Sequence, residues 1–365
     1  MVNKENWENK KLEDVCKAQT SNIIMREAQT SDGEYPLFGA SGFIKNIENY
    51  HQDKPYIGVI KDGSGIGRVN VYPPYSSLLG TMQYIIPKPN VTLDFLKYLL
   101  IGMHLERFKS GAAIPHIYFK NYKNGHLLLP PKTVQITISS KLNTINSLIT
   151  IKQKQLKEFE CLEQTLFCKT FLAEGLQWYL VKIGDYFKVG TGATPSRKVP
   201  EYYDGDIAWV KSTEVNNDVI SNVSERISLK ALEETNCKVY PVNTILIAMY
   251  GQGKTRGQVG LLEIEAATNQ ACAAIIPNEK VCNVKYMFFC LKMSYEKLRD
   301  MARGANQANL NLSLIKSFRI PLPPLSMQQS FARKIDAIEK QKTVVQDEIT
   351  QLQALLDSEM DKYFG

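Results

Sequence analysis

Two similar stretches define the architecture of the chain: LLLPPKTVQITISSKLNTI at residues 127–145 and PLPPLSMQQSFARKIDAI at residues 321–338. In each, a double proline precedes a long segment without glycine or proline, a pattern that signals the start of a helix. The two double prolines are 193 positions apart. The same offset relates Gln135 to Gln328, Lys141 to Lys334, and Phe171 to Phe364.

The duplication extends upstream of the helices. Trp7 with KLEDV at 11–15 matches Trp178 with KIGDY at 182–186, at an offset of 171 positions. The offset grows to 193 at the double prolines, so the second copy carries about 22 extra residues in its middle. A unit repeated at this scale sets the architecture before any single motif does.

The segments after the prolines have a heptad repeat of apolar residues. One seam consists of Leu142, Ile149 and Leu156 with Ile145, Phe159 and Leu166; the other of Ile335, Ile349 and Leu356 with Ile338, Val345 and Leu352. This regularity favours a coiled coil of two helices, each about 35 residues and roughly 50 Å long at ~1.5 Å per residue. Two separate amphipathic helices, each lying on its own domain, are the alternative.

Polar residues interrupt both seams: Lys152, Glu163, Lys342 and Glu359. Opposite charges within a seam can fix its register, and we hypothesise that Glu163 meets Lys342. Antiparallel pairing of two like helices predicts a pseudo-twofold arrangement, with the globular units at opposite ends.

The segments before the helices have a mixed pattern. Short β-rich runs, such as 56–60 and 244–248, alternate with glycine-rich turns, and helical stretches follow at 93–108 and 284–303. We therefore predict an α+β fold with two domains built on twisted β-sheets, separated by two long antiparallel coiled-coil helices. The predicted segments are 1–132, 133–172, 173–325 and 326–365.

Composition and net charge limit the classes of protein to which the chain can belong. The net charge of +7 and a pI of about 8.8 mildly favour an anionic partner such as nucleic acid. No apolar run is long enough to span a membrane and no secretory signal opens the chain, so we expect a cytoplasmic protein. The seven cysteines form no CxxC pair and the four histidines no metal-binding motif, which favours reduced core thiols over disulfides or zinc.

With this organisation, the chain resembles the specificity subunits of type I restriction–modification systems. PPLSMQQ at 323–329 carries the resemblance most clearly, although family members often have Glu before the Gln. The second unit begins with two motifs that resemble those of family members, GATPS at 192–196 and YYDGDIAWV at 202–210. The first unit resembles a different branch of such domains in two motifs, YPLFGASG at 35–42 and DGSGIGRV at 62–69. The resemblance covers nearly the whole chain.

The resemblance implies a function. Each globular unit would be a target recognition domain reading half of a split site in double-stranded DNA, with the helices setting the gap. Two modification subunits carrying S-adenosylmethionine would dock on the helical region and methylate adenine. Restriction subunits would use ATP and Mg to translocate DNA. This chain would bind no cofactor or metal and would contain no catalytic residue.

Two motifs resemble catalytic loops and lack a necessary part. YPPY at 72–75 is similar to an adenine methyltransferase loop, but that chemistry needs an amide or carboxylate where Tyr72 stands. AMYGQGKT at 248–255 ends like a phosphate-binding loop, but Ala248 replaces its first glycine and the following residues do not read as a helix.

Candidate DNA contacts come from glycine-rich and amide-rich loops, because their side chains bond phosphates and base edges. They are Lys61, Ser64 and Arg68 in the first unit, and Thr191, Thr194, Ser196, Arg197, Lys198, Gln252, Lys254, Arg256, Asn306, Gln307 and Asn309 in the second. Each could instead be a turn residue or a solvated charge. A stand-alone nucleic-acid methyltransferase or ATPase, or a coiled-coil scaffold that binds only proteins, are the alternative functions.

Overall fold

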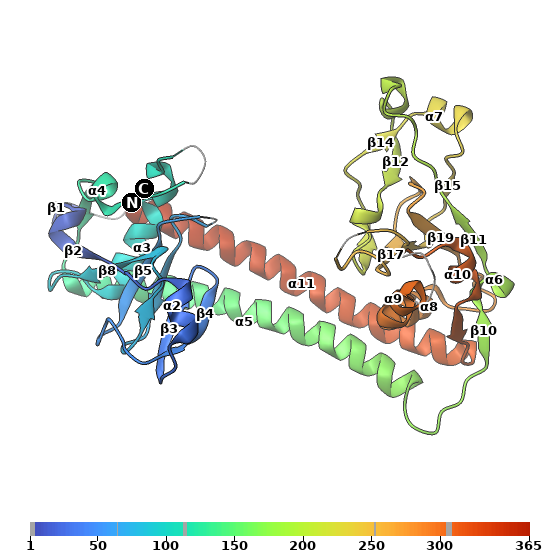
Figure 1. The fold of residues 1–365 in the computed structure, drawn as a ribbon, viewed down its shortest axis with the longest axis horizontal. Coiled ribbons are helices and arrows are strands. Elements are labelled where there is room, and N and C mark those ends of the chain that lie inside the picture. The colour runs from blue at the N-terminus through green and yellow to red at the C-terminus, as the bar shows by residue number, and fades with distance from the viewer. Residues whose placement is uncertain (1–3, 64, 112–114, 252, 304–308) are drawn as a thin grey trace. The chain divides into compact units, whose positions relative to one another are not determined.

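The computed structural model describes residues 4–63, 65–111, 115–251, 253–303 and 309–365. Its contacts divide the chain into a first unit, Met1–Lys154 with Gln346–Gly365, and a second unit, Gln155–Val345. Each unit combines β-sheets, short helices and one half of each of two long helices (Figure 1). The predicted α+β class is confirmed, and the exact bounds of the four predicted segments remain a prediction.

The first unit is built on a four-stranded antiparallel sheet in the order β2-β8-β5-β6, beside a smaller sheet, β4-β3-β7, and a two-stranded pair, β1-β9. Its strands are β1 (Glu8–Lys11), β2 (Cys16–Thr20), β3 (Tyr35–Gly39), β4 (Gly42–Ile47), β5 (Tyr56–Ile60), β6 (Val69–Tyr72), β7 (Ser77–Leu78), β8 (Met82–Pro87) and β9 (His126–Leu129). Its helices are α1 (Leu12–Val15), α2 (Met25–Thr30), α3 (Leu93–Gly102), η1 (Leu105–Phe108), α4 (Phe119–Tyr122) and the start of α5 (Lys132–Phe171).

The second unit has a five-stranded sheet, β11-β19-β16-β17-β13, a smaller sheet, β14-β12-β18-β15, and the pair β10-β20. Its strands are β10 (Leu180–Lys182), β11 (Lys188–Thr191), β12 (Ile207–Val210), β13 (Asp218–Ile220), β14 (Arg226–Ile227), β15 (Val239–Tyr240), β16 (Ile245–Ala248), β17 (Val259–Leu262), β18 (Ala266–Thr268), β19 (Cys272–Ile276) and β20 (Arg319–Pro321). Its helices are α6 (Ile183–Tyr186), η2 (Pro200–Tyr203), η3 (Ser212–Glu214), α7 (Leu229–Glu234), α8 (Val284–Met293), α9 (Tyr295–Arg303), α10 (Leu312–Ser317) and the start of α11 (Leu325–Phe364).

The predicted duplication is confirmed strand by strand. The order β2-β8-β5-β6 of the first unit repeats as β11-β19-β16-β17 in the second, with antiparallel pairing throughout. The smaller sheets also correspond, because β3 runs parallel to β7 as β12 runs parallel to β18. Most of the extra residues of the second copy lie between β12 and β16, where they form η3, β13, α7 and β15, while β14 pairs with β12 as β4 pairs with β3.

The helical stretches predicted at 93–108 and 284–303 are each broken once. In the first unit α3 ends at Gly102, and His104 takes a left-handed conformation (φ 49°) before η1 begins. In the second unit Ser294 separates α8 from α9. In the first unit α3 packs on β5, β6 and β8 (Figure 1). Its residues Phe95 and Leu96 are fully buried.

The two long helices each have 40 residues, and they pair antiparallel within each unit. In the first unit Lys141 contacts Glu359 (2.8 Å) and Lys152 contacts Glu348 (2.6 Å). In the second unit Phe167 and Phe171 pack against Phe331, with ring centroids 5.7 and 5.3 Å apart. All twelve predicted seam residues are buried or half-buried, which confirms the coiled coil over separate amphipathic helices.

The predicted contact between Glu163 and Lys342 is present. The Lys342 ammonium donates to both carboxylate oxygens of Glu163, at 3.2 and 3.3 Å, and the Glu163 side chain is only 4% exposed. Burial raises the pKa of the Glu163 carboxyl, and the neighbouring charge of Lys342 offsets part of that rise.

A buried glutamine joins each double proline to the globular part of its unit. Gln135 donates to the carbonyls of Pro130 (2.9 Å) and Asn90 (3.1 Å), and its side-chain oxygen accepts from the amide of Thr92 (2.9 Å). Thr92 is the residue that caps the N-terminus of α3.

The second unit repeats this connection. Gln328 donates to Pro323 (2.7 Å) and accepts from the amide of Asn283 (2.8 Å), the residue that caps α8. Both glutamines are fully buried. The start of each long helix is therefore held to the start of the helix that covers the sheet.

All seven cysteines are free, and five are buried as predicted. Burial raises the pKa of the Cys16, Cys272, Cys282 and Cys290 thiols to about 12. The prediction of core thiols is wrong for Cys161, which is exposed on α5. None of the described helices is long and apolar enough to cross a membrane.

We expect Gln328→Ala to lower the free energy of unfolding of the full chain by about 2–4 kcal/mol, because it leaves two buried backbone groups unsatisfied. Gln329→Ala removes an exposed side chain from the adjacent position and is the matched control, expected within about 0.5 kcal/mol of wild type. Denaturant unfolding measures both. Equal stability of the two variants would show that the buried amide does not hold the helix.

We expect Lys342→Ala to lower the free energy of unfolding by about 1–3 kcal/mol at pH 7.5, because the buried Glu163 carboxylate loses its counter-charge. The folded-state pKa of Glu163 lies above its usual value, so protonation as the pH falls toward 5 removes that cost and the deficit shrinks. Lys340→Ala, on an exposed position of the same helix, is the control. A deficit that stayed constant between pH 7.5 and 5 would contradict this role.

Candidate nucleic-acid interface

In the second unit, two of the predicted loops leave the large sheet at the same edge. Thr191, the last residue of β11, pairs with Ala273 of β19, and Ala248, the last residue of β16, pairs with Cys272 of the same strand. The loop after β11 and the hairpin after β16 therefore start two strands apart, ~10 Å at the usual strand spacing. We call this the loop edge of the unit.

The first unit has an equivalent loop edge. Thr20 ends β2 opposite Gln83, and Ile60 ends β5 opposite Met82, next to it on β8. In both units the chain returns to this edge before the segment that leads to the long helix. The Ile117 amide donates to the Lys61 carbonyl (2.9 Å), and the equivalent Leu310 amide donates to Met249 (3.1 Å).

The loop at 192–198 in the second unit is held firmly. Gly192 lies so close to the Thr268 carbonyl oxygen that a Cβ would approach it to 1.6 Å, so only glycine fits. The Trp209 indole donates to the Ala193 carbonyl (3.1 Å), and the Tyr203 hydroxyl donates to the Pro195 carbonyl (2.6 Å).

Most predicted contact residues of this loop are exposed, namely Thr194, Ser196, Arg197 and Lys198. Thr191 is half-buried, and its hydroxyl donates to the Cys272 carbonyl (2.8 Å). Thr191 therefore stabilises the end of the sheet. The Thr194 hydroxyl contacts the side-chain oxygen of Gln270, an exposed residue in the turn before β19.

The glycine-rich hairpin of the second unit is clamped from one side by α9. One terminal nitrogen of Arg299 donates to the carbonyls of Gly253 (2.9 Å) and Arg256 (3.3 Å), and the Tyr295 hydroxyl donates to the Lys254 carbonyl (2.7 Å). The Lys254 side chain is exposed, whereas Arg256 is half-buried. Of the two, Lys254 is the better placed to meet an external phosphate.

The hairpin of the first unit is tied in a different way. The Asp62 carboxylate contacts both the Lys61 ammonium (3.6 Å) and the ring of His116 (2.5 Å). Arg68 is exposed and donates to the carbonyls of Gly65 (3.3 Å) and Ala40 (3.4 Å). Lys61 is therefore partly neutralised by Asp62, while the Arg68 side chain remains open to solvent.

Four predicted contact residues lie outside the described residues: Ser64, Gln252, Asn306 and Gln307. Asn309 is described and exposed, directly before the bond that ties Leu310 to the hairpin. Loop, hairpin and returning segment thus meet at one edge of each unit, and contact of these residues with DNA stays a prediction.

Sequence reasoning missed four residues of the second loop edge: Gln270, Lys211, Glu225 and Arg299. They lie in no glycine-rich motif and reach the predicted loops only through sheet pairing and helix packing; Glu225, for example, contacts both Arg197 and Lys211. The turn at 269–271 between two buried strands was the one local signal available for Gln270.

The two incomplete catalytic motifs lie in a strand end and in a hairpin. Tyr72 is the last residue of β6, buried and stacked on Tyr56 with ring centroids 5.7 Å apart. The segment after Ala248 turns back into β17 as a hairpin, so no helix N-terminus follows it to receive a phosphate. Within the described residues, no cluster of three His, Cys, Asp or Glu side chains is placed to hold a metal.

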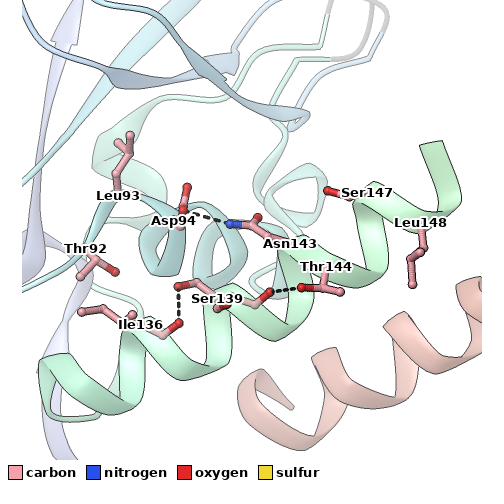
Figure 2. Close-up of a pocket in the computed structure, with 10 residues that line it drawn as sticks. Thr92, Leu93, Asp94, Ile136, Ser139, Asn143, Thr144, Ser147 and Leu148 are labelled. Atoms are coloured by element: carbon pink, nitrogen blue, oxygen red, sulfur yellow. Dashed lines mark hydrogen bonds between the residues drawn. The ribbon is translucent and has the colours of Figure 1, made fainter. Parts of the chain in front are cut away.

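A polar groove lies in the first unit where α3 begins beside α5, and Figure 2 shows its lining. Asn143 donates to the Asp94 carboxylate (3.0 Å), and the Ser139 hydroxyl donates to the Gln135 carbonyl (2.8 Å). The Thr144 hydroxyl likewise bonds the carbonyl of Ser140 (2.9 Å). These side chains satisfy one another and the helix, so the groove offers a surface for contact and no arrangement suited to catalysis.

Comparison with known proteins gives a consistent result. The family described as type I restriction modification DNA specificity domain matches residues 4–160 and 176–354. The chain is 33% identical over 186 residues to the Type I restriction enzyme MjaIX specificity subunit of Methanocaldococcus jannaschii, covering 49% of this chain and 42% of that protein. It is 25% identical over 160 residues to the EcoR124I/EcoR124II specificity subunit of Escherichia coli, covering 42% and 39%. The matches span less than half of either relative.

Solved structures share the fold over the full length. The S subunit of a type I restriction-modification system from M. genitalium aligns with a TM-score of 0.65 at 16% identity, covering 100% of this chain and 98% of the other. A chain from a type I R-M system studied for complex assembly and conformational transition aligns with a TM-score of 0.62 at 15% identity, covering 99% and 98%. With the family matching both repeats, the chain belongs to the family of type I restriction–modification DNA specificity proteins.

Proposed function

We propose that this chain reads double-stranded DNA for a type I restriction–modification complex and recognises a split site with a fixed gap. The observation that carries the proposal is the duplication: two units with the same sheet order, each presenting a loop edge and each continuing into a paired 40-residue helix. Two like units in one chain suit the two halves of a split site.

The chemistry of the loop edges supports DNA as the ligand. Exposed Arg68, Lys198 and Lys254 are suited to phosphates, and such contacts give salt-dependent affinity without reading sequence. Exposed side chains such as Arg197 and Gln270 are suited to base edges in the major groove, where a mismatched pair costs ~1–3 kcal/mol.

In this proposal the partner subunits catalyse the reactions, and this chain positions the DNA for them. Modification subunits carrying S-adenosylmethionine methylate an adenine, which must leave the base stack to be reached. Restriction subunits use ATP and Mg to move DNA. The specificity chain binds no cofactor, contributes no catalytic residue and works in the cytoplasm.

Equivalent apolar residues on the helices support two copies of the modification subunit. Ile151 in the first unit corresponds to Val344 in the second, and Leu162 in the second corresponds to Leu355 in the first, both at the 193-residue offset. All four are exposed, by 45–59%. Exposed apolar side chains repeated in both units suit two identical partners, one for each repeat.

A methylation map tests the function. The chain is co-expressed with the modification subunit of its own system in a host without other adenine methylation, and methyladenine is located by sequencing. We expect a two-part motif with a constant gap, and exchange of residues 1–130 for another such domain changes only one half. A complex that assembles and methylates nothing would favour the protein-scaffold function, and S-adenosylmethionine binding by the isolated chain would favour a stand-alone methyltransferase.

Substitution on the helices tests the stoichiometry. We expect Ile151→Asp or Val344→Asp each to remove one of two modification subunits, because a charge replaces an apolar contact. Native mass spectrometry should then show one modification subunit per chain in place of two. Gln153→Asp and Gln346→Asp are exposed controls at the same offset and should retain both. Loss of both partners from a single substitution, or of neither, would contradict two equivalent docking surfaces.

A further inference from the structure

Arg197 is held in place by a stacked ring and an ion pair. Its guanidinium carbon lies 4.0 Å from the Tyr203 ring centroid, and its Nη2 lies 2.5 Å from Oε2 of Glu225. Its side chain is nevertheless 58% exposed. A planar guanidinium fixed on one face and at one nitrogen presents its remaining N–H groups in a set direction.

Glu225 holds a second cation as well. Its other oxygen, Oε1, accepts from the Lys211 ammonium at 2.7 Å. Hydrogen bonds from Lys211 and then from Arg197 lower the pKa of the Glu225 carboxyl, so it is ionised at neutral pH. Two cations share this carboxylate, so the trio of Arg197, Lys211 and Glu225 carries a net positive charge, while the nearby Glu214 carboxylate accepts from the Lys211 backbone amide (2.8 Å).

Arg197 is not needed to hold its own loop. That loop is fixed by the Trp209 and Tyr203 hydrogen bonds to Ala193 and Pro195 and by the tight contact of Gly192. Exposed ion pairs also add little to stability. We therefore expect the ordered guanidinium to have a role other than stabilising the fold.

We infer that Arg197 reads a guanine in the second half-site and that Glu225 is the residue that positions it. This inference rests on the proposed function and names the base that one side chain recognises. A fork of two N–H donors matches O6 and N7 of guanine in the major groove, and the fixed plane gives the bidentate geometry its selectivity. Lys211 balances the charge of Glu225 so that the carboxylate orients Arg197 without cancelling the trio's positive charge.

The test uses the complex of the full chain with its modification subunits and duplexes carrying every single-base change in the mapped site. Glu225→Gln keeps the shape and removes the charge, and Arg197→Lys keeps the charge and removes the fork. We expect both to reduce discrimination about 10-fold at one G·C pair of the second half-site. Discrimination across the first half-site should not change. Glu234→Gln, an exposed carboxylate of the same unit that contacts Tyr202, is the control and should match wild type.

Loss of discrimination without loss of overall affinity separates positioning from a structural role. Affinity for unrelated duplex DNA should stay constant or rise in Glu225→Gln, because a negative charge has been removed near the phosphates. If Arg197→Lys kept full discrimination, or if Arg197→Ala weakened all sequences equally and reduced the salt slope by about 0.9, Arg197 would contact a phosphate and the inference would be wrong. If Glu225→Gln failed to fold, Arg197→Lys would still decide. A wild-type complex without a split motif would instead refute the proposed function.

Discussion

The architecture of each unit rests on a buried glutamine at the start of its long helix. Gln135 and Gln328 each join a proline carbonyl to the backbone amide of the residue whose side chain caps the helix covering the sheet. A side chain with one donor group and one acceptor group suits this position, since neither Glu nor Leu could satisfy both partners. Because the joint fixes the direction in which the helix leaves its domain, it also fixes the loop edge relative to the helix within each unit.

The helix pair keeps its register through charges placed inside an apolar seam. Lys141 with Glu359, Lys152 with Glu348, and Glu163 with Lys342 match only when the helices run antiparallel in this alignment. Glu163 and Glu359 are buried, so sliding the helices by one heptad would leave these two carboxylates without their partners. A seam of uniform leucine would bind more strongly and specify the register less well.

The periodicity of the sequence was sufficient to predict the architecture, because a duplicated element must fit the same pattern in both copies. The helices, their seams, the Glu163 contact and the repeated hairpins all follow from spacing. The loop edge was only partly predictable: Arg197 and Lys254 stand in recognisable loops, whereas Glu225, Gln270 and Arg299 reach them through sheet pairing and helix packing. The half-buried state of Arg256 and the partial neutralisation of Lys61 by Asp62 likewise depend on neighbours distant in sequence. Local patterns single out candidate loops, and tertiary contacts decide which of their side chains are exposed.

The proposed split site with a fixed gap requires one distance between the half-sites. Methylation is measured on duplexes in which the mapped half-sites are separated by gaps that differ in single base-pair steps. Each step changes the separation by about 3.4 Å and rotates one half-site about the duplex axis. We expect one gap with full activity and a fall of at least about 10-fold at one base pair longer or shorter. Equal methylation across several neighbouring gaps would contradict it, because the two units would then move independently.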